Sequence, residues 1–314
     1  MSVIELVAYV VAQLVGGFLG GGAALILECS LPGGNIGFPA LGAGVGVGSA
    51  LVAEAAVTFA LCHVVLHVAT TSQQANNSYY GLAIGFTVLS GAVSVGGVSG
   101  GAFNPAVGLA LPLLKGHGSD VWIYVLGPLL GAALAAALFS ITHPHELAEG
   151  SRGLCARGSR SLRGSQEAGP FFIEFIGTFY LAFTVACAAA PSNAGGLAPL
   201  AIGSALMAQV FAGGATSGAQ YNPAVTIGIY VRRALATHSV GAACVQLKEQ
   251  FSGWTAIGYI VVQCLGALVG GSIARLVLFG QMIGFPQPAS DIGPAFVAEL
   301  MATFLLVTTV LQVS

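Results

Sequence analysis

Eight apolar segments of this chain are each long enough to cross a membrane. They cover residues 3–27, 49–70, 79–98, 121–141, 170–190, 197–213, 254–279 and 292–313. A spanning helix needs about 20 mostly apolar residues. Charged residues make up only 6% of the chain, against about 25% in soluble globular proteins. The sequence therefore predicts an all-α, integral, multi-pass membrane protein embedded in a lipid bilayer.

The basic residues predict how the chain is oriented. Threading the eight spans from a cytoplasmic start leaves only Lys115 and Arg275 outside. The seven basic residues on the inner side are Arg152, Arg157, Arg160, Arg163, Arg232, Arg233 and Lys248. Cytoplasmic loops of membrane proteins carry an excess of Lys and Arg. We therefore expect the polar linker 142–169 to be cytoplasmic, and we interpret its four Arg as an orientation signal rather than a nucleic-acid site.

The pattern E-x-x-x-T-F occurs in three of the apolar segments. It reads EAAVTF from Glu54, EFIGTF from Glu174 and ELMATF from Glu299. A carboxylate at membrane depth is costly, so it should face protein and find hydrogen-bond donors. We interpret the three glutamates as buried structural carboxylates that accept hydrogen bonds from loop amides, and we favour this role over proton relay. Glu299 has no following loop of this kind, so it should be the least satisfied.

A second repeated motif is more specific. SGGAFNPAVG at residues 99–108 and SGAQYNPAVT at 217–226 each follow an apolar segment and open a run too short to cross alone. Asn is a good helix cap and Pro fits the first turn, so each motif should start a half-helix. Irregular backbone at membrane depth must be buried by protein or line a water-filled cavity. Two such motifs point to a site at the middle of the membrane between inverted repeats.

One helix sequence occurs at both ends of the chain. YVVAQLVGGFLGG at residues 9–21 returns as YIVVQCLGALVGG at 259–271. Gln13 and Gln263 lie at matching positions inside these segments, where they can hydrogen-bond to neighbouring helices.

With the paired Asn-Pro-Ala motifs and their glutamate-bearing segments, the chain resembles the aquaporin, or major intrinsic protein, family. The resemblance implies a bundle in which two half-helices meet. Residues 1–141 are similar to family helices three to six with the second half-helix. The linker 142–169 follows, and residues 170–314 are similar to helices one to four with the first half-helix. The halves thus stand in swapped order.

Two readings of this order stay open. A longer tandem protein was truncated, or the piece folds as a permuted channel. In the permuted channel, residues 49–141 and 170–279 form one barrel, and the terminal spans 3–27 and 292–313 are not part of it.

The resemblance implies a passive channel for water or small uncharged solutes that excludes ions and protons. Its pore centre would be formed by Asn104, Pro105, Ala106, Asn222, Pro223 and Ala224. The two Asn offer amide donors, the Ala keep the meeting point small, and the Pro stack. Alternatives are a glycerol, urea or ammonia facilitator and a non-conducting fragment of a tandem channel. The resemblance also implies a homotetramer.

The resemblance places a selectivity filter at four positions, three of which hold other residues than in family water channels. Counting from the motifs, these positions hold Ala92, Gly101, Val107 and Ile202, where Ala, Val and Ile replace a His, an Arg and an aromatic residue. Without the guanidinium and with a wider opening, solutes larger than water should pass.

The remaining polar residues favour structural roles. His63 and His67 are four apart on one helical face, a spacing able to hold a metal, but nothing in the segment completes a ligand set. We interpret them as helix-end or pore-vestibule residues. His143, His145 and Glu146 fall in the linker and should form solvated surface. The scattered Cys lack metal-ligand spacing. We expect no cofactor, no metal and no enzymatic activity.

Overall fold

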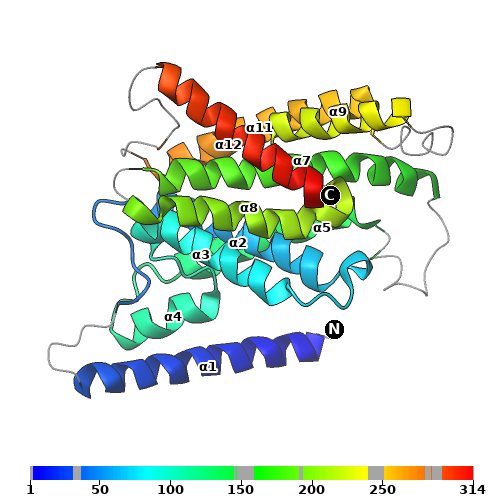
Figure 1. The fold of residues 1–314 in the computed structure, drawn as a ribbon. Helices are drawn as coiled ribbons and strands as arrows, with labels where there is room; N and C mark the ends of the chain where they lie inside the picture. The colour runs from blue at the N-terminus through cyan, green and yellow to red at the C-terminus, as the bar shows by residue number, and fades with distance from the viewer. Residues whose placement is uncertain are drawn as a thin grey trace.

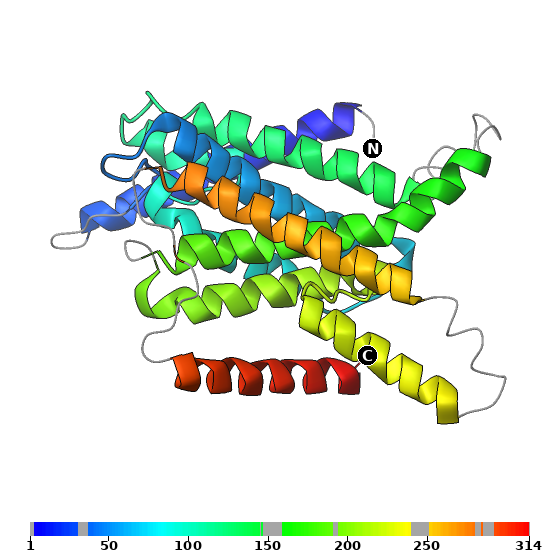
Figure 2. The same cartoon turned by 90° about the horizontal axis from the view of Figure 1, so that it is seen from above.

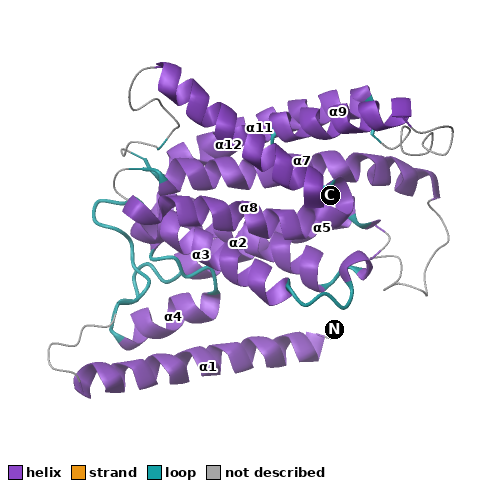
Figure 3. Cartoon of the chain, in the orientation of Figure 1, coloured by secondary structure: helices purple, strands orange, loops and turns teal. Residues whose placement is uncertain are grey.

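The structure is a computed structural model of the chain. It describes residues 3–30, 37–144, 146, 159–190, 194–239, 251–279, 284 and 292–313. Within these ranges the regular secondary structure is helical throughout (Figure 3). The described part contains eight helices long and apolar enough to span a membrane, which confirms the predicted all-α membrane fold.

The spanning helices follow the predicted segments closely. They are α1 Val3–Ser30, α2 Val47–Ala69, α3 Tyr80–Ser99, α5 Ile123–Thr142, α7 Ser159–Ala188, α8 Ala198–Ser217, α11 Gly253–Val277 and α12 Ile292–Val313. The shorter elements are α4 Pro105–Leu114, α9 Pro223–Ser239 and the single turns η1 Ser72–Gln74 and η2 Gly195–Leu197. One boundary differs, because α7 begins at Ser159, inside the expected linker, and continues unbroken through Pro170.

Six helices form a central bundle. α2 packs on α5 and α7 packs on α11, while α3 and α8 join the two halves (Figures 1 and 2). The largest buried apolar cluster lies between the halves and draws on both. It includes Val57 of α2, Val95 of α3, Phe183 of α7 and Val277 of α11. The core therefore joins the front and back parts of the chain into one body.

Glycines allow the paired helices to approach closely. A Cβ built on Gly131 of α5 would lie 2.3 Å from the Ala55 carbonyl oxygen of α2. In the second half, a Cβ on Gly266 of α11 would lie 2.3 Å from the Phe175 carbonyl oxygen of α7. A side chain at either position would clash with backbone, as expected for membrane helices that pack through small residues. The two helix pairs are thus built alike.

The remaining helices lie on two opposite sides of the central bundle. α1 packs against α4 on one side, and α12 packs against α9 on the other (Figures 1 and 2). The outer spans have little protein around them: only 6% of the apolar window of α1 and 0% of that of α12 is buried.

Candidate functional site

Each repeated motif starts a half-helix with an Asn cap. The Asn104 side-chain oxygen accepts a 2.9 Å hydrogen bond from the Ala106 amide, and Pro105 occupies the first turn of α4. Asn222 does the same at α9, where its side-chain oxygen lies 2.8 Å from the Ala224 amide nitrogen. Because the carboxamide oxygen is engaged as an acceptor, the side-chain NH₂ is left as a donor.

A buried glutamate holds the loop before α4. One Glu54 carboxylate oxygen accepts hydrogen bonds from the Ser99 hydroxyl at 2.7 Å and the Ala102 amide at 3.0 Å. The other accepts from the Phe103 amide at 2.7 Å. Phe103 has a φ of 52°, a left-handed backbone that costs a non-glycine residue energy. The hydrogen bonds predicted for Glu54 are present, and they stabilise this strained turn.

The loop before α9 repeats this arrangement. Glu174 accepts hydrogen bonds from the Ser217 hydroxyl at 2.6 Å, the Gln220 amide at 2.9 Å and the Tyr221 amide at 2.7 Å. Tyr221, like the matching aromatic residue of the first motif, is left-handed, with a φ of 50°. A further donor is the Gln263 side chain, 2.8 Å from the carboxylate. The hydrogen bonds predicted for Glu174 are therefore also present.

Sequence reasoning missed two tyrosines, one for each loop, whose hydroxyls hydrogen-bond to the loop backbone. The Tyr124 hydroxyl of α5 donates to the Ser99 carbonyl at 2.7 Å, and the Tyr259 hydroxyl of α11 donates to the Ser217 carbonyl at 3.1 Å. Tyr124 lies in the first turn of α5, and Tyr259 lies in the second turn of α11, each ahead of the glycines through which its helix packs. A Tyr preceding a glycine-bearing helix face is the signal that could have identified them.

Glu299 does not share this environment. It lies on α12 and is exposed, so the expectation of a third buried carboxylate is wrong. The physical reason is that α12 lies at the outside of the bundle, where its main contact is with α9 and none of its apolar window is buried. The expectation that Glu299 would be the least satisfied of the three agrees with this position.

The two half-helices do not meet. They enter from opposite ends of the bundle, as expected, but α4 lies on the side of α1 and α9 on the side of α12 (Figures 1 and 2). Their main contacts are with different helices: α4 packs on α1 and α5, and α9 on α11 and α12. The prediction that Asn104 and Asn222 approach each other, with Pro105 stacked on Pro223, is therefore wrong for this structure. Each half-helix is held by the glutamate of its own half, and the halves pack through their other faces.

Comparisons with known proteins agree with these motifs. The family described as Major intrinsic protein matches residues 1–139, 156–240 and 210–314. The chain belongs to the major intrinsic protein family. Its match in three stretches is consistent with tandem family units.

Relatives of this major intrinsic protein match only part of it. A protein named Probable aquaporin TIP1-2, from Oryza sativa subsp. japonica, is 34% identical over 151 residues, which is 46% of this chain and 59% of the relative. Probable aquaporin AqpM of Archaeoglobus fulgidus is 37% identical over 146 residues, 43% of this chain and 58% of the relative. Aquaporin-4 of Mus musculus is 28% identical over 139 residues, 44% of this chain and 43% of its own length. The chain thus spans about half the length of the curated relatives it matches. No solved structure gives a significant match.

The four expected filter positions lie on α3, the loop that follows it, α4 and α8. Ala92 of α3 and Gly101 are neighbours, because a Cβ built on Gly101 would lie 3.6 Å from the Ala92 Cα. Val107 lies on α4 with 49% of its surface exposed, and Ile202 lies on α8, which packs on α3 and α7. That these four residues form one filter is a proposal.

A histidine cluster lies away from the motifs. The ring centroids of His63 and His67 are 4.1 Å apart, and those of His67 and His143 are 4.7 Å apart. All three side chains are buried, so the prediction that His143 is solvated surface is wrong. The reason is that the His143 ring, at the C-cap of α5, stacks on Phe139 with centroids 4.8 Å apart, and its Nε2 lies 3.2 Å from the Thr216 hydroxyl of α8. The described residues form no group of three His, Cys, Asp or Glu able to hold a metal.

Glu146 of the expected linker also makes hydrogen bonds to the rest of the protein. The Glu146 carboxylate accepts hydrogen bonds from the Ser72 amide and hydroxyl, both at 2.7 Å, and it is half-buried rather than fully solvated. His145 lies outside the described residues.

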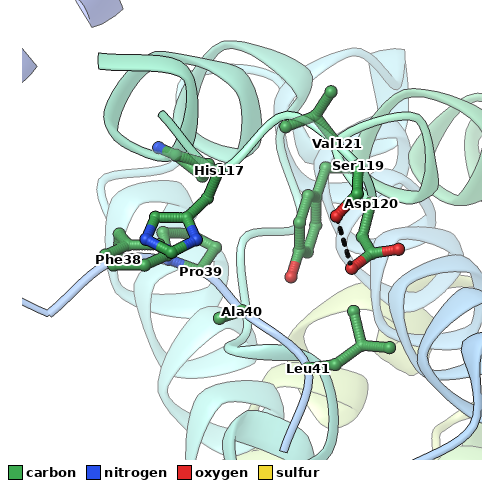
Figure 4. A pocket seen from close by; sticks show the side chains of 10 residues that line it. Phe38, Pro39, Ala40, Leu41, His117, Ser119, Asp120 and Val121 are labelled. Atoms are coloured by element: carbon green, nitrogen blue, oxygen red, sulfur yellow. Dashed lines mark hydrogen bonds between the residues drawn. The ribbon is translucent and has the colours of Figure 1, made fainter. Parts of the chain in front are cut away.

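A cavity of about 210 Å³ lies between the loop before α2, the C-terminal end of α4 and the start of α5. Figure 4 shows Phe38, Pro39, Ala40 and Leu41 along one wall and Ser119, Asp120 and Val121 near the start of α5. The His117 ring stacks on Phe38 with centroids 4.8 Å apart. The loop carrying Phe38 is fixed to the end of α3, because the Gly42 amide donates to the Val98 carbonyl at 3.0 Å. The cavity therefore lies at the end of α4 that is remote from Asn104.

Proposed function

We propose that this protein is a passive transmembrane channel of the major intrinsic protein family for water or small uncharged solutes. The duplicated loop carries this proposal. In each half a buried glutamate, Glu54 or Glu174, fixes a strained turn that leads into an Asn-capped half-helix. The names of the relatives, all aquaporins, support the same class.

The half-helices supply the chemistry of permeation. The N-terminus of a helix carries about half a positive elementary charge from its aligned peptide dipoles. The side-chain NH₂ group of Asn104 adds a neutral donor at the start of α4, and that of Asn222 adds one at the start of α9. At either helix end, a water molecule whose oxygen accepts from the Asn side chain has less capacity to accept from a neighbouring water, which disfavours a proton chain. Cations are opposed by the positive helix ends.

The proposal includes two further points, which follow from the order of the family segments and from the distribution of basic residues. Residues 1–141 and 170–314 belong to consecutive family units, and the linker 142–169 faces the cytoplasm. The family resemblance also favours a homotetramer.

A second candidate is a non-conducting part of a tandem channel. The observation that favours it is the position of α4 and α9 on opposite sides of the bundle. In this arrangement each half-helix would need further helices of its own unit to close a pore around it.

Osmotic swelling of proteoliposomes separates the two candidates. If the protein is a channel, we expect water flux above that of empty vesicles, and a loss of that flux in Asn104→Ala, in Asn222→Ala, or in both. Leu126→Ala, on an exposed apolar face of α5, is the matched control and should conduct normally. Wild-type flux equal to that of empty vesicles, with the protein correctly inserted, supports the non-conducting candidate.

A further inference from the structure

α1 repeats the side chains with which α11 packs. The shared set is a Tyr, a Gln and two Gly at intervals of four, three and four residues. It comprises Tyr9, Gln13, Gly16 and Gly20 in α1, and Tyr259, Gln263, Gly266 and Gly270 in α11. Residues at these intervals lie along one face of a helix.

In α11 this face is covered by the fold. Gln263 donates to the Glu174 carboxylate of α7 at 2.8 Å. A Cβ on Gly270 would lie 2.3 Å from the Phe179 carbonyl oxygen of α7. Tyr259 is only 3% exposed. The four residues thus form a docking face for a parallel helix that carries a buried carboxylate.

In α1 the same face is uncovered within the described chain. Tyr9 is 63% exposed and Gln13 is exposed, and nothing lies within 4 Å of a Cβ built on Gly16 or Gly20. α1 nevertheless has a fixed place, because its Gly17 packs on the backbone of Ala106 in α4. The expectation that Gln13 hydrogen-bonds between helices is not met in the structure.

An uncovered Gln at membrane depth needs a partner. Polar side chains within spanning helices face protein and hydrogen-bond across helices rather than meeting lipid. The uncovered glycines leave room for the backbone of a second helix to approach closely. Both features are the ones that the packed copy, α11, uses against α7.

We propose that the Tyr9–Gln13–Gly16–Gly20 face of α1 binds a partner membrane helix of the α7 type. Such a helix runs parallel to α1 and carries the E-x-x-x-T-F pattern, so that its carboxylate accepts a hydrogen bond from Gln13. α1, α7 and α11 run in the same direction across the bundle (Figure 1), so the α7–α11 pair is a direct template.

A second copy of this chain does not supply that helix. α12 carries an exposed Glu299 in the same pattern, but it runs antiparallel to α1 (Figure 1). The glutamate-bearing helices α2 and α7 are already packed on α5 and α11. The occupant is therefore a glutamate-bearing helix of another family unit. The α1 face recognises it through the carboxylate that accepts from Gln13 and through close backbone contact at the glycines.

A peptide with the sequence of residues 168–188 serves as the probe for this surface. The full-length chain and the peptide are reconstituted in liposomes, and their association is measured by energy transfer between attached dyes. We expect saturable binding that weakens about threefold to tenfold with Gln13→Leu in the chain or with Glu174→Leu in the peptide. Gly16→Leu and Gly20→Leu should abolish it. Gly22→Leu, at a glycine of α1 that also has open space around it, is the matched control and should bind normally.

Three results would overturn the proposal. They are the absence of saturable binding, equal binding by Gly16→Leu and Gly22→Leu, and self-association of the chain that depends on Gly16 and Gly20. Insertion of the peptide in place of the chain's own α7 would give equal binding by these two variants, since neither touches α11. The experiment measures no flux, so it succeeds or fails independently of the proposed channel activity.

Discussion

The side-chain amide nitrogen of Gln263 lies 2.8 Å from a carboxylate oxygen of Glu174. The same nitrogen lies 3.0 Å from the Thr226 hydroxyl of α9. One buried side chain thus connects α11 to α7 and to the half-helix that starts at Asn222. The first half has no equivalent, because Pro128 of α5 takes the matching place after Tyr124.

We expect Gln263→Leu to lower the free energy of unfolding in detergent by about 1–2 kcal/mol, because the Glu174 carboxylate and the Thr226 hydroxyl each lose a buried hydrogen bond. Chemical denaturation followed by circular dichroism measures this change. Gln13→Leu, at the matching position of α1, is the control and should leave stability unchanged since Gln13 is exposed. Equal loss in both variants would contradict the assigned role of Gln263.

We expect Glu54→Ala and Glu174→Ala each to reduce the yield of folded protein strongly. Each substitution leaves two buried loop amides without an acceptor, at about 1–3 kcal/mol for each amide. Glu299→Ala should give wild-type yield because Glu299 is exposed. Size-exclusion chromatography of the membrane extract measures the monodisperse fraction. Normal yield from both Glu54→Ala and Glu174→Ala would refute their role in holding the loops.

We expect Gly131→Ala and Gly266→Ala each to destabilise the bundle by about 1–3 kcal/mol, because the new methyl group would meet a backbone carbonyl of the paired helix. Gly16→Ala adds the same methyl group where nothing lies within 4 Å, so its midpoint should match that of the wild type. Thermal unfolding in detergent compares the three variants. A destabilised Gly16→Ala would show that α1 is already packed on this face.

If the four filter positions act together, the variant carrying both Val107→Arg and Ala92→His should reduce glycerol and urea uptake. The guanidinium and the imidazole narrow the opening and add fixed donors. Solute-driven swelling of proteoliposomes, run beside water flux, measures the change. Unchanged solute uptake in the double variant would show that these residues form no common filter. Leu126→Ala again controls for the effect of substitution alone.

The sequence alone determined where the spanning helices lie and which loop each buried glutamate binds. Spans such as 49–70 and 254–279 were predictable because the need for about 20 apolar residues is local. The hydrogen bonds between each glutamate, Glu54 or Glu174, and its loop were predictable too. A carboxylate in an apolar segment must find donors, and the nearest loop amides belong to the following SG-x-x-x-NPAV motif. Both inferences depend on short-range chemistry.

Only the tertiary structure decided which faces of the helices meet. It placed α4 and α9 on opposite sides of the bundle, buried His143 at the end of α5 and left Gln13 and Glu299 exposed. In water, a polar stripe reveals the outer face of a helix. In lipid, the outer and inner faces of these helices are equally apolar, so the pattern of hydrophobic residues does not tell them apart. Close packing at glycines and a few buried hydrogen bonds make that choice, and they act between segments far apart in the chain.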